Sequence, residues 1–327
     1  MNVKDEQLIF SLKQSLESRS GLDGVRFSHY SLPELDFDEV DASVVFLGER
    51  FSAPIIIGSM TGGSEWSGRV NRKLALAAES ENIPFSTGSQ KVALKNPRLI
   101  KTFNVKKFSP SVFLISNIGG SALLDFSFDE IEGSLQAVEA DALFVHLNPL
   151  QELIQKDGVK RWRGVRGRIE ELCDYLSVPV LVKEVGNGLN RRTALELQAC
   201  GVKGLDVAGF GGTNWSVIES ERRGLKGSVF EGWGLSTLES LLECRGLKIP
   251  VIGSGGVRSG LDVARVIRLG GSLASASLPF LKAVLEGRLE SEIEKWVEEL
   301  KITMMLTRSK SLKELRKAEL LKEGVLS

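Results

Sequence analysis

The chain has 327 residues, of which 42% are hydrophobic and 26% are charged, as in ordinary globular proteins. Lysine plus arginine and aspartate plus glutamate each number 42, so the formal net charge is zero. This balance argues against a nucleic-acid-binding or membrane-surface protein. No apolar run reaches the roughly 18 residues that a membrane span needs, and MNVKDEQLIF has no signal-peptide core.

Three cysteines, Cys173, Cys200 and Cys244, lie far apart and have no metal-ligand spacing. An odd number of scattered cysteines does not form a disulfide framework. We therefore expect three reduced thiols in helices and a cytoplasmic protein.

The first 53 residues predict an extension that precedes the main fold. Residues 5–17 are expected to form a short helix. The acidic stretch LPELDFDEVDASVVFLGERFSAP is expected to be mostly loop with one hairpin, in which SVVFL and FSAP flank a GER turn.

From residue 55 onward, short apolar runs alternate with segments of helical period. Dense Val, Ile and Leu runs are typical of parallel strands that are buried on both faces. The predicted strands are 55–59, 85–89, 112–116, 142–147, 180–185, 204–208, 250–254 and 273–277. The predicted helices between them are 68–81, 129–138, 166–176, 190–200, 235–244 and 259–268. Eight such units in about 230 residues predict an α/β fold of the TIM (β/α)8 barrel type.

Two amphipathic helices, ESEIEKWVEELKITMML and SLKELRKAELL, are predicted after the barrel. We therefore interpret residues 1–327 as one domain. It consists of an N-terminal extension (1–53), the barrel (54–285) and C-terminal helices (286–327).

The active site of this fold lies at the carboxyl ends of the strands, where nearly every unit supplies glycine and a polar side chain. GSGGVRSG follows the seventh strand, and Gly255, Gly256 and Arg258 could bind a phosphate there. The alternative is a tight turn with Ser259 as a helix cap. GFGGTNW lacks the spacing of a dinucleotide-binding turn.

Lys183 interrupts the apolar strand VLVKEV. A lysine inside a barrel strand needs an anionic partner, which could be a neighbouring carboxylate or a bound cofactor or anion. Asp206 in GLDVAG raises the same question, and there we favour a structural role.

HLNPLQE at residues 146–152 follows the fourth predicted strand. Asn148 as cap, Pro149 at the first helical position and Gln151 at the capping-box position could simply start a helix. This does not explain His146 or Glu152. His146 and Asn148 share one strand face, and Glu152 would lie near the rim, where it could bind Mg²⁺ beside a phosphate.

Together these motifs resemble the type 2 isopentenyl-diphosphate isomerases, which are FMN-dependent TIM barrels. In chain order they are GLDGVRFSHYSLPELDFDEVD, APIIIGSMTGG, STGSQ, HLNPLQE, PVLVKEVGNG, DVAGFGGTNW, GSGGVRSGLDVA and ASLPFL, spanning about residues 21–285. The resemblance implies conversion of isopentenyl diphosphate to dimethylallyl diphosphate, with reduced FMN handling the protons. It also implies NAD(P)H as flavin reductant, Mg²⁺, and a homo-oligomer of four or more copies.

The resemblance assigns roles by position. It implies that FMN is held by Met60, Thr61, Ser89, Asn117, Lys183, Thr213, Gly256, Arg258, Ser275 and Ala276. His146, Asn148 and Gln151 would face the substrate as catalytic residues, Glu152 would bind Mg²⁺, and Lys4 with Gln151 would bind the substrate.

The chain departs from the family at its N-terminus. The family has Arg, Lys and His in the segment that clasps the diphosphate, and here Val3, Lys4 and Gln7 stand in those positions. Replacing Arg removes a two-pronged phosphate contact. Near the C-terminus, LTR replaces LTG, which places Arg308 where glycine is usual.

Two alternatives stay open at this point. One is another FMN enzyme on the same barrel, of the α-hydroxy-acid oxidase type, which needs a histidine base and arginines that grip a carboxylate. The chain has only two histidines, His146 and His29, and His29 lies before the barrel. The other is a relative that binds a flavin or a prenyl diphosphate but has lost activity.

Overall fold

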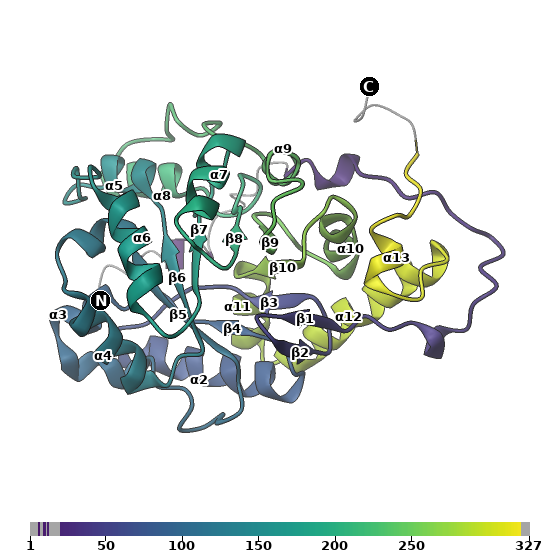
Figure 1. Cartoon of the computed structure of the whole chain (residues 1–327), viewed down its shortest axis with the longest axis horizontal. Coiled ribbons are helices and arrows are strands. Elements are labelled where there is room, and N and C mark those ends of the chain that lie inside the picture. Colours follow the sequence, from purple (N-terminus) through teal and green to yellow (C-terminus); the bar gives the residue numbers. More distant parts are fainter. Residues whose placement is uncertain (1–5, 7–8, 11, 13–19, 322–327) are drawn as a thin grey trace.

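A computed structural model describes residues 6, 9, 10, 12 and 20–321 of the chain. Eight parallel strands close into a barrel in the order β10-β3-β4-β5-β6-β7-β8-β9, with helices around it (Figure 1). The strands are β3 (Ile55–Ile57), β4 (Phe85–Ser86), β5 (Leu114–Gly119), β6 (Ala142–His146), β7 (Val180–Lys183), β8 (Leu205–Asp206), β9 (Val251–Ser254) and β10 (Leu273–Ala276). The predicted barrel is confirmed, and all eight predicted runs contain a strand.

Most strands are shorter than predicted, but β5 extends three residues beyond its predicted end. The α-helices are α2 (Glu65–Ser80), α3 (Lys91–Lys95), α4 (Phe128–Val138), α5 (Pro149–Ile154), α6 (Val165–Tyr175), α7 (Arg191–Ala199), α8 (Trp215–Arg222), α9 (Thr237–Glu243), α10 (Gly260–Arg268), α11 (Leu278–Glu286), α12 (Leu289–Leu306) and α13 (Leu312–Leu315). Four 3₁₀ helices are η1 (Leu22–Gly24), η2 (Phe37–Glu39), η3 (Pro97–Thr102) and η4 (Gly120–Leu124). Helices α3, α8 and α11 were not predicted from the sequence. Of the predicted helix 5–17, the described residues 6, 9, 10 and 12 are helical.

An antiparallel hairpin, β1 (Val44–Phe46) and β2 (Glu49–Phe51), closes the amino-terminal end of the barrel. The predicted GER turn was wrong. Leu47 and Gly48 form the turn with φ values of 52° and 92°, and Glu49 already pairs with Phe46. Two consecutive positive φ values define the two-residue turn that matches strand twist.

The inside of the barrel is apolar at this hairpin end. Phe46 and Phe51 of the hairpin are 2% and 3% exposed and belong to one buried cluster with side chains from the strands. The strand members are Ile56, Ile115, Ala142, Phe144, Leu181, Ile252 and Leu273. Burying each of these two phenylalanine side chains contributes about 1.5–3 kcal/mol to stability, which holds the hairpin against the end of the barrel.

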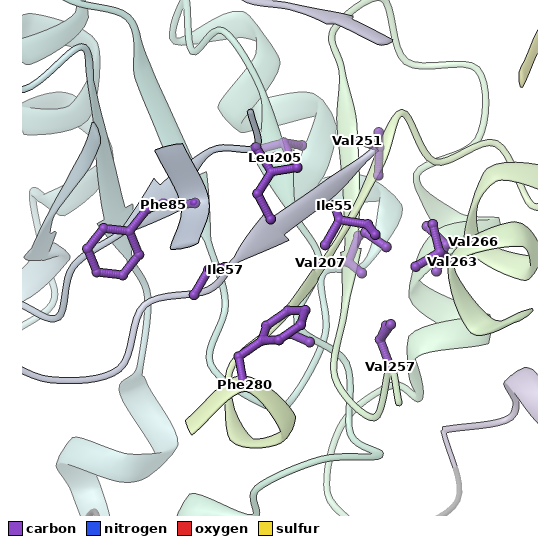
Figure 2. Close-up of a cluster of buried hydrophobic side chains, with 14 of the residues drawn as sticks. Ile55, Ile57, Phe85, Leu205, Val207, Val251, Val257, Val263, Val266 and Phe280 are labelled. Carbon is purple, nitrogen blue, oxygen red and sulfur yellow. The ribbon is translucent and has the colours of Figure 1, made fainter. Parts of the chain in front are cut away.

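A second, larger apolar core lies between the strands and the surrounding helices. Figure 2 shows part of it, where Val263 and Val266 of α10 lie near Val251 of β9. Alternation along the strands explains the two cores, because neighbouring residues point to opposite faces. Ile55 and Ile57 belong to the outer core, and Ile56 belongs to the inner one.

The second C-terminal helix is shorter than predicted and ends at Leu315. Residues 316–321 instead lie against the segment that follows η1, where Ser28 N donates to Glu319 O at 2.9 Å and Leu321 N donates to Arg26 O at 2.9 Å. Backbone pairing with this distant segment therefore replaces the last helical turns.

All three cysteines are free. Cys173 lies in α6, as predicted, whereas Cys200 and Cys244 are the C-cap residues of α7 and α9, one position beyond the helices that the prediction included them in. Burial raises the thiol pKa of Cys173 to about 11 and that of Cys244 to about 12, so these two thiols are poor nucleophiles. Within the described part of the chain, no helix has the length and apolar character needed to cross a membrane.

Candidate active site

The interior of the barrel changes from apolar to polar over a single step along the strands. Side chains two residues apart on a strand point to the same face. The residues two positions after the apolar layer therefore form the next interior layer, toward the carboxyl ends of the strands. In this way Ile115 is followed by Asn117, Phe144 by His146, Leu181 by Lys183, Ile252 by Ser254 and Leu273 by Ser275. The carboxyl end of the barrel therefore holds a polar layer. Asp206 belongs to it as the register partner of Lys183, and Ser86 adjoins it through its hydroxyl, which contacts Ser59.

One side of this polar layer is a chain of hydrogen bonds. The hydroxyls of Ser59 and Ser86 lie 2.6 Å apart, and Asn117 Nδ2 donates to Ser59 Oγ at 2.9 Å. Asn117 Oδ1 lies 2.7 Å from His146 Nδ1. The His146 ring packs over Gly119, where a Cβ would come within 3.2 Å of Nε2. Asn117 thus fixes the orientation of His146.

Lys183 is the last residue of β7, and its side chain belongs to the interior layer. Its Nζ donates to the backbone oxygen of Glu184 at 2.5 Å. Among the residues that the structure describes, no carboxylate lies within 4.0 Å of Nζ, so the ion-pair alternative is not what is found. Lys183 is half-buried at the carboxyl end of β7, and its ammonium group is held by this backbone oxygen.

Glu184 is the next residue, and the sequence analysis did not single it out. Its side chain is only 5% exposed, and Oε2 accepts hydrogen bonds from the backbone N–H groups of Val185, Gly186 and Asn187 at 2.7, 2.8 and 2.6 Å. Burial raises its pKa to about 7, although these donors and Lys183 lower it. This carboxylate shapes the loop after β7 and does not bind Lys183.

The helix after HLN begins as predicted, with Asn148 before it and Pro149 as its first residue. The predicted capping was wrong, because neither Asn148 nor Gln151 makes the expected backbone bond. Asn148 has φ −132° and ψ 47°, outside the extended geometry of a cap. Its Nδ2 donates instead to Gln151 Oε1 at 3.1 Å and to Glu152 Oε1 at 3.4 Å.

Glu152 lies on the rim and is held by the loop that follows α5. Val159 N donates to Glu152 Oε2 at 2.7 Å, and Lys160 Nζ donates to the Glu152 backbone oxygen at 3.2 Å. Gly158 lets this loop approach, because a Cβ there would lie 1.9 Å from Glu152 O. Among the described residues, Oε1 makes one hydrogen bond, the long one with Asn148.

Glu219 of α8 is a site residue that the sequence analysis missed. It is 1% exposed and accepts from Gln151 Nε2 at 3.4 Å and from Arg222 Nη1 at 2.7 Å. Arg222 also lies 3.6 Å from Glu6, so α8 connects the mouth to the N-terminal extension. Asn214, which caps α8 by accepting from Ser216 N and Val217 N, was the signal that could have revealed this helix.

Two glycine-rich loops meet at the mouth, after β8 and after β9. A Cβ on Gly255 would lie 2.0 Å from Gly209 O, and one on Gly256 would lie 2.2 Å from Gly211 O. Arg258 Nη2 donates to Gly211 O at 2.9 Å, which joins the same loops. Ser259 caps α10 by accepting from Asp262 N at 3.2 Å, as the structural alternative for this segment predicts. Loop packing therefore explains the glycines without a ligand.

The other predicted residues also lie at this end of the barrel, except Lys4, which is outside the described residues together with Val3 and Gln7. Met60 and Thr61 follow β3, Ser89 follows β4, Thr213 precedes α8, and Ser275 and Ala276 end β10. The side chain of Ala276 belongs to the outer core, so only its backbone can face the mouth.

Two buried polar atoms at the mouth have no hydrogen-bond partner within the described part of the chain. They are Thr61 Oγ1 and Asn148 Oδ1, on residues that are 1% and 5% exposed. A buried polar atom without a partner costs about 1–3 kcal/mol, so such atoms indicate groups that a ligand would satisfy. Two surface depressions of 290 and 400 Å³ lie elsewhere, against α4 with α6 and beside the hairpin.

Comparison with known proteins agrees with this architecture. The family model for FMN-dependent dehydrogenases matches residues 151–322. A solved mandelate oxidase with a monooxide FMN adduct superposes with a TM-score of 0.66 at 15% identity, covering 97% of this chain and 92% of that one. At this identity the likeness shows the fold alone. Fold, polar mouth and family model together define a barrel of the FMN-dependent dehydrogenase class.

Relatives with higher sequence identity than this solved structure identify the family within that class. The isopentenyl-diphosphate delta-isomerase of Rickettsia felis is 42% identical over 97% of this chain and 95% of its own length. That of Rickettsia prowazekii is 41% identical over 97% and 96%. The chain belongs to the isopentenyl-diphosphate delta-isomerase family and is an isomerase, as the resemblance predicted.

Proposed function

We propose that the protein converts isopentenyl diphosphate to dimethylallyl diphosphate, with reduced FMN bound over the polar layer and Mg²⁺ bound at Glu152. The observation that carries this proposal is the polar interior layer at one end of an otherwise apolar barrel. It adjoins the rim that holds Gln151, Glu152 and Glu219. The identity to named isomerases over the whole chain supports the same reaction.

The residues at the mouth fit a flavin. An isoalloxazine ring needs hydrogen-bond donors on one edge and a flat surface to rest on, and its phosphate needs backbone N–H groups. Lys183 Nζ, Asn117 Nδ2 and the Thr61 hydroxyl supply donors. In our proposal FMN is held by Met60, Thr61, Ser89, Asn117, Lys183, Thr213, Gly256, Arg258, Ser275 and the backbone of Ala276.

Bound FMN in its reduced form supplies acid–base chemistry, so that a proton is added at one carbon and another is removed two carbons away. The chain's own residues position the substrate for this. Gln151 is oriented on both sides, because its Oε1 accepts from Asn148 and its Nε2 donates to Glu219. His146 is fixed by Asn117 and would face the diphosphate or the alkene with Asn148.

The residues on the rim fit Mg²⁺ but not a metal held by protein alone. In the described ranges no three His, Cys, Asp or Glu side chains gather into a metal site. Mg²⁺ commonly uses one or two carboxylates and completes its shell with water and substrate phosphate. Glu152 Oε1, which makes a single long hydrogen bond of 3.4 Å among the described residues, and Asn148 Oδ1, which has no partner in the described part, are suitable oxygens for this.

NAD(P)H as flavin reductant, and a homo-oligomer of four or more copies, are further parts of the proposal. Large apolar side chains beside the mouth support self-association: Leu153, Leu225, Val229 and Trp233 are 52%, 53%, 95% and 61% exposed. Light scattering on the purified protein measures the number of copies, and a monomer at all concentrations would contradict this part.

The decisive experiment is conversion of isopentenyl diphosphate by purified protein with FMN, Mg²⁺ and a chemical reductant that fully bleaches the flavin. We expect dimethylallyl diphosphate, and none without Mg²⁺ or with oxidised flavin. No product from a fully reduced protein would overturn the proposal. Bleaching by a 2-hydroxy acid in place of product would identify an oxidase, and tight diphosphate binding without turnover would identify an inactive relative.

A further inference from the structure

The pairing between β7 and β8 breaks off at the mouth in an unusual way. Val182 N donates to Gly204 O and Glu184 N donates to Asp206 O, both at 3.1 Å, as in a regular parallel ladder. The next bond of such a ladder would join Ala208 N to Glu184 O. Instead Ala208 N donates to Asp206 Oδ1 at 3.2 Å, and Glu184 O accepts from Lys183 Nζ at 2.5 Å.

Two polar side chains therefore replace one backbone hydrogen bond. The backbone adjusts at the same place, since Ala208 has φ 35°, in the left-handed region that residues other than glycine rarely adopt. Strain of this kind persists only where surrounding contacts impose it. Two hydrogen bonds hold Ala208 here: its N donates to the Asp206 carboxylate at 3.2 Å, and its O accepts from Gly188 N at 3.1 Å.

Asp206 is fixed from a second side as well. Ser254 of the neighbouring strand β9 donates from Oγ to Asp206 Oδ1 at 2.5 Å. Asp206 is 1% exposed and is the direct register neighbour of Lys183 across the seam. Burial raises the pKa of this carboxyl group, whereas the neighbouring Lys183 and the donors Ser254 and Ala208 N lower it and so favour the ionised form.

Glu184 is not the carboxylate that lies beside Lys183 inside the barrel. Alternation turns its side chain to the outer face, and its Oε2 is occupied by three backbone N–H groups. The interior carboxylate beside Lys183 is therefore Asp206, and it acts without a direct ion pair.

We propose that Asp206 is the positioning residue for Lys183. By holding Ala208 N, it leaves Glu184 O open to anchor the ammonium group. By its charge, it offsets part of the positive field that Lys183 exerts on the mouth. The second effect rests on the proposed function, in which Lys183 faces FMN.

Two substitutions separate these effects. Asp206→Asn keeps an acceptor for Ala208 N and Ser254 Oγ but removes the charge. Reduction adds negative charge to FMN beside Lys183, so we expect this variant to favour reduced over oxidised FMN by about tenfold. For a two-electron couple this equals a rise of about 30 mV in midpoint potential. Asp206→Ala removes the acceptor as well, and we expect its affinity for oxidised FMN to fall at least about tenfold as Lys183 loses its anchor.

The matched control is Asp141→Asn. Asp141 forms a direct ion pair with Lys106 at 2.8 Å and, like Asp206, accepts a backbone N–H, here from Leu114 at 2.7 Å, but it lies at the hairpin end of the barrel. We expect Asp141→Asn to leave both the midpoint potential and the affinity for FMN unchanged. A milder variant, Ser254→Ala, keeps the Asp206 carboxyl group but removes the hydrogen bond that Ser254 donates to it. Its affinity for FMN should fall several-fold, with little change in the midpoint potential of the flavin.

An unchanged potential in Asp206→Asn would overturn the electrostatic role. Unchanged FMN affinity in both Asp206→Ala and Ser254→Ala would overturn the positioning role. These outcomes differ from failure of the proposed function, in which the unmodified protein itself would bind no FMN or form no product.

Discussion

Gln151 and Glu219 meet across the barrel mouth from two different helices, with Gln151 Nε2 donating to Glu219 Oε1 at 3.4 Å. The carboxylate is buried and is held from its other side by Arg222. This pair links the HLNPLQE segment to α8, which the sequence analysis did not predict. It places an ionisable group one hydrogen bond away from a residue that we expect to face the substrate.

The first prediction concerns this pair. Glu219→Gln should lower kcat by about 10²–10⁴, the usual loss when a positioned acid–base group is removed, and should leave FMN affinity unchanged. Single-turnover assays with fully reduced protein measure the effect. Glu196→Gln, which replaces a carboxylate in an exposed i,i+4 pair, is the control and should have full activity. Equal kcat in both variants would show that Glu219 is only structural.

Glu152→Gln should raise the Mg²⁺ concentration for half-maximal turnover by about ten- to a hundredfold, because one charged metal ligand is lost. FMN should stay bound. A Mg²⁺ titration of initial rates measures this, and Asp157→Asn, an exposed carboxylate of the following loop, is the control. Release of flavin from Glu152→Gln with unchanged Mg²⁺ dependence would contradict a metal role.

Lys183→Ala should weaken FMN by about ten- to a hundredfold, the loss expected for one charge-assisted hydrogen bond. Fluorescence titration of the flavin-free protein gives the dissociation constant. Lys106→Ala at the opposite end of the barrel removes a lysine that is paired with Asp141, and it should leave FMN affinity unaltered. Similar affinities for both variants would count against a contact between Lys183 and FMN.

Arg308 has φ 55° just after α12, the left-handed conformation that glycine adopts most easily. Its guanidinium donates to the backbone oxygens of Leu32 and Pro33 and lies 5.3 Å from the Tyr30 ring, so it holds the N-terminal extension. Arg308→Ala keeps the strained backbone and loses these contacts, whereas Arg308→Gly removes the strain as well. We expect urea denaturation to show that the glycine variant is more stable than the alanine variant by about 1 kcal/mol. Equal stabilities would mean that position 308 carries no strain.

Glu184 should make stability depend on pH. Burial raises its pKa from 4.5 to about 7 in the folded protein, so the folded state binds a proton more tightly than the unfolded state does. The contribution of Glu184 to the free energy of unfolding is therefore fully present below about pH 4.5. It is lost as the pH rises through 7, and the loss amounts to at most about 3 kcal/mol. Burial raises the pKa of Asp206 in the same direction, so Glu184→Gln should flatten this decline only in part. If the free energy of unfolding of Glu184→Gln declined with pH as steeply as that of the unmodified protein, the raised pKa of Glu184 would be contradicted.

The barrel was predictable because its strands are short runs of Val, Ile and Leu, and such runs follow from burial on both faces. Helix α8 was not predictable in the same way, since Trp215–Arg222 carries polar residues such as Ser216, Ser220 and Glu219 on its buried side. Glu219 is buried although it is charged, because it contacts Gln151 and Arg222, and a hydropathy pattern would assign such residues to the surface.

The capping prediction at Asn148 failed for a related reason. Local spacing of Asn148, Pro149 and Gln151 matches a helix start, but the carboxamide of Asn148 turns to the side chains of Gln151 and Glu152. Those contacts depend on the loop from Gly158 to Lys160 that holds Glu152. Contacts from outside the motif decide its geometry, and local pattern cannot show them.

The hairpin that closes the amino-terminal end has a kinetic consequence. With Phe46 and Phe51 filling that end, the polar layer can be reached only from the carboxyl side. In the proposed function, a nicotinamide donor and an alkene diphosphate would then approach over the same opening, and the product would leave by it. The two should exclude each other, so an excess of either one slows the step that needs the other, and reduction and isomerisation take place in turn.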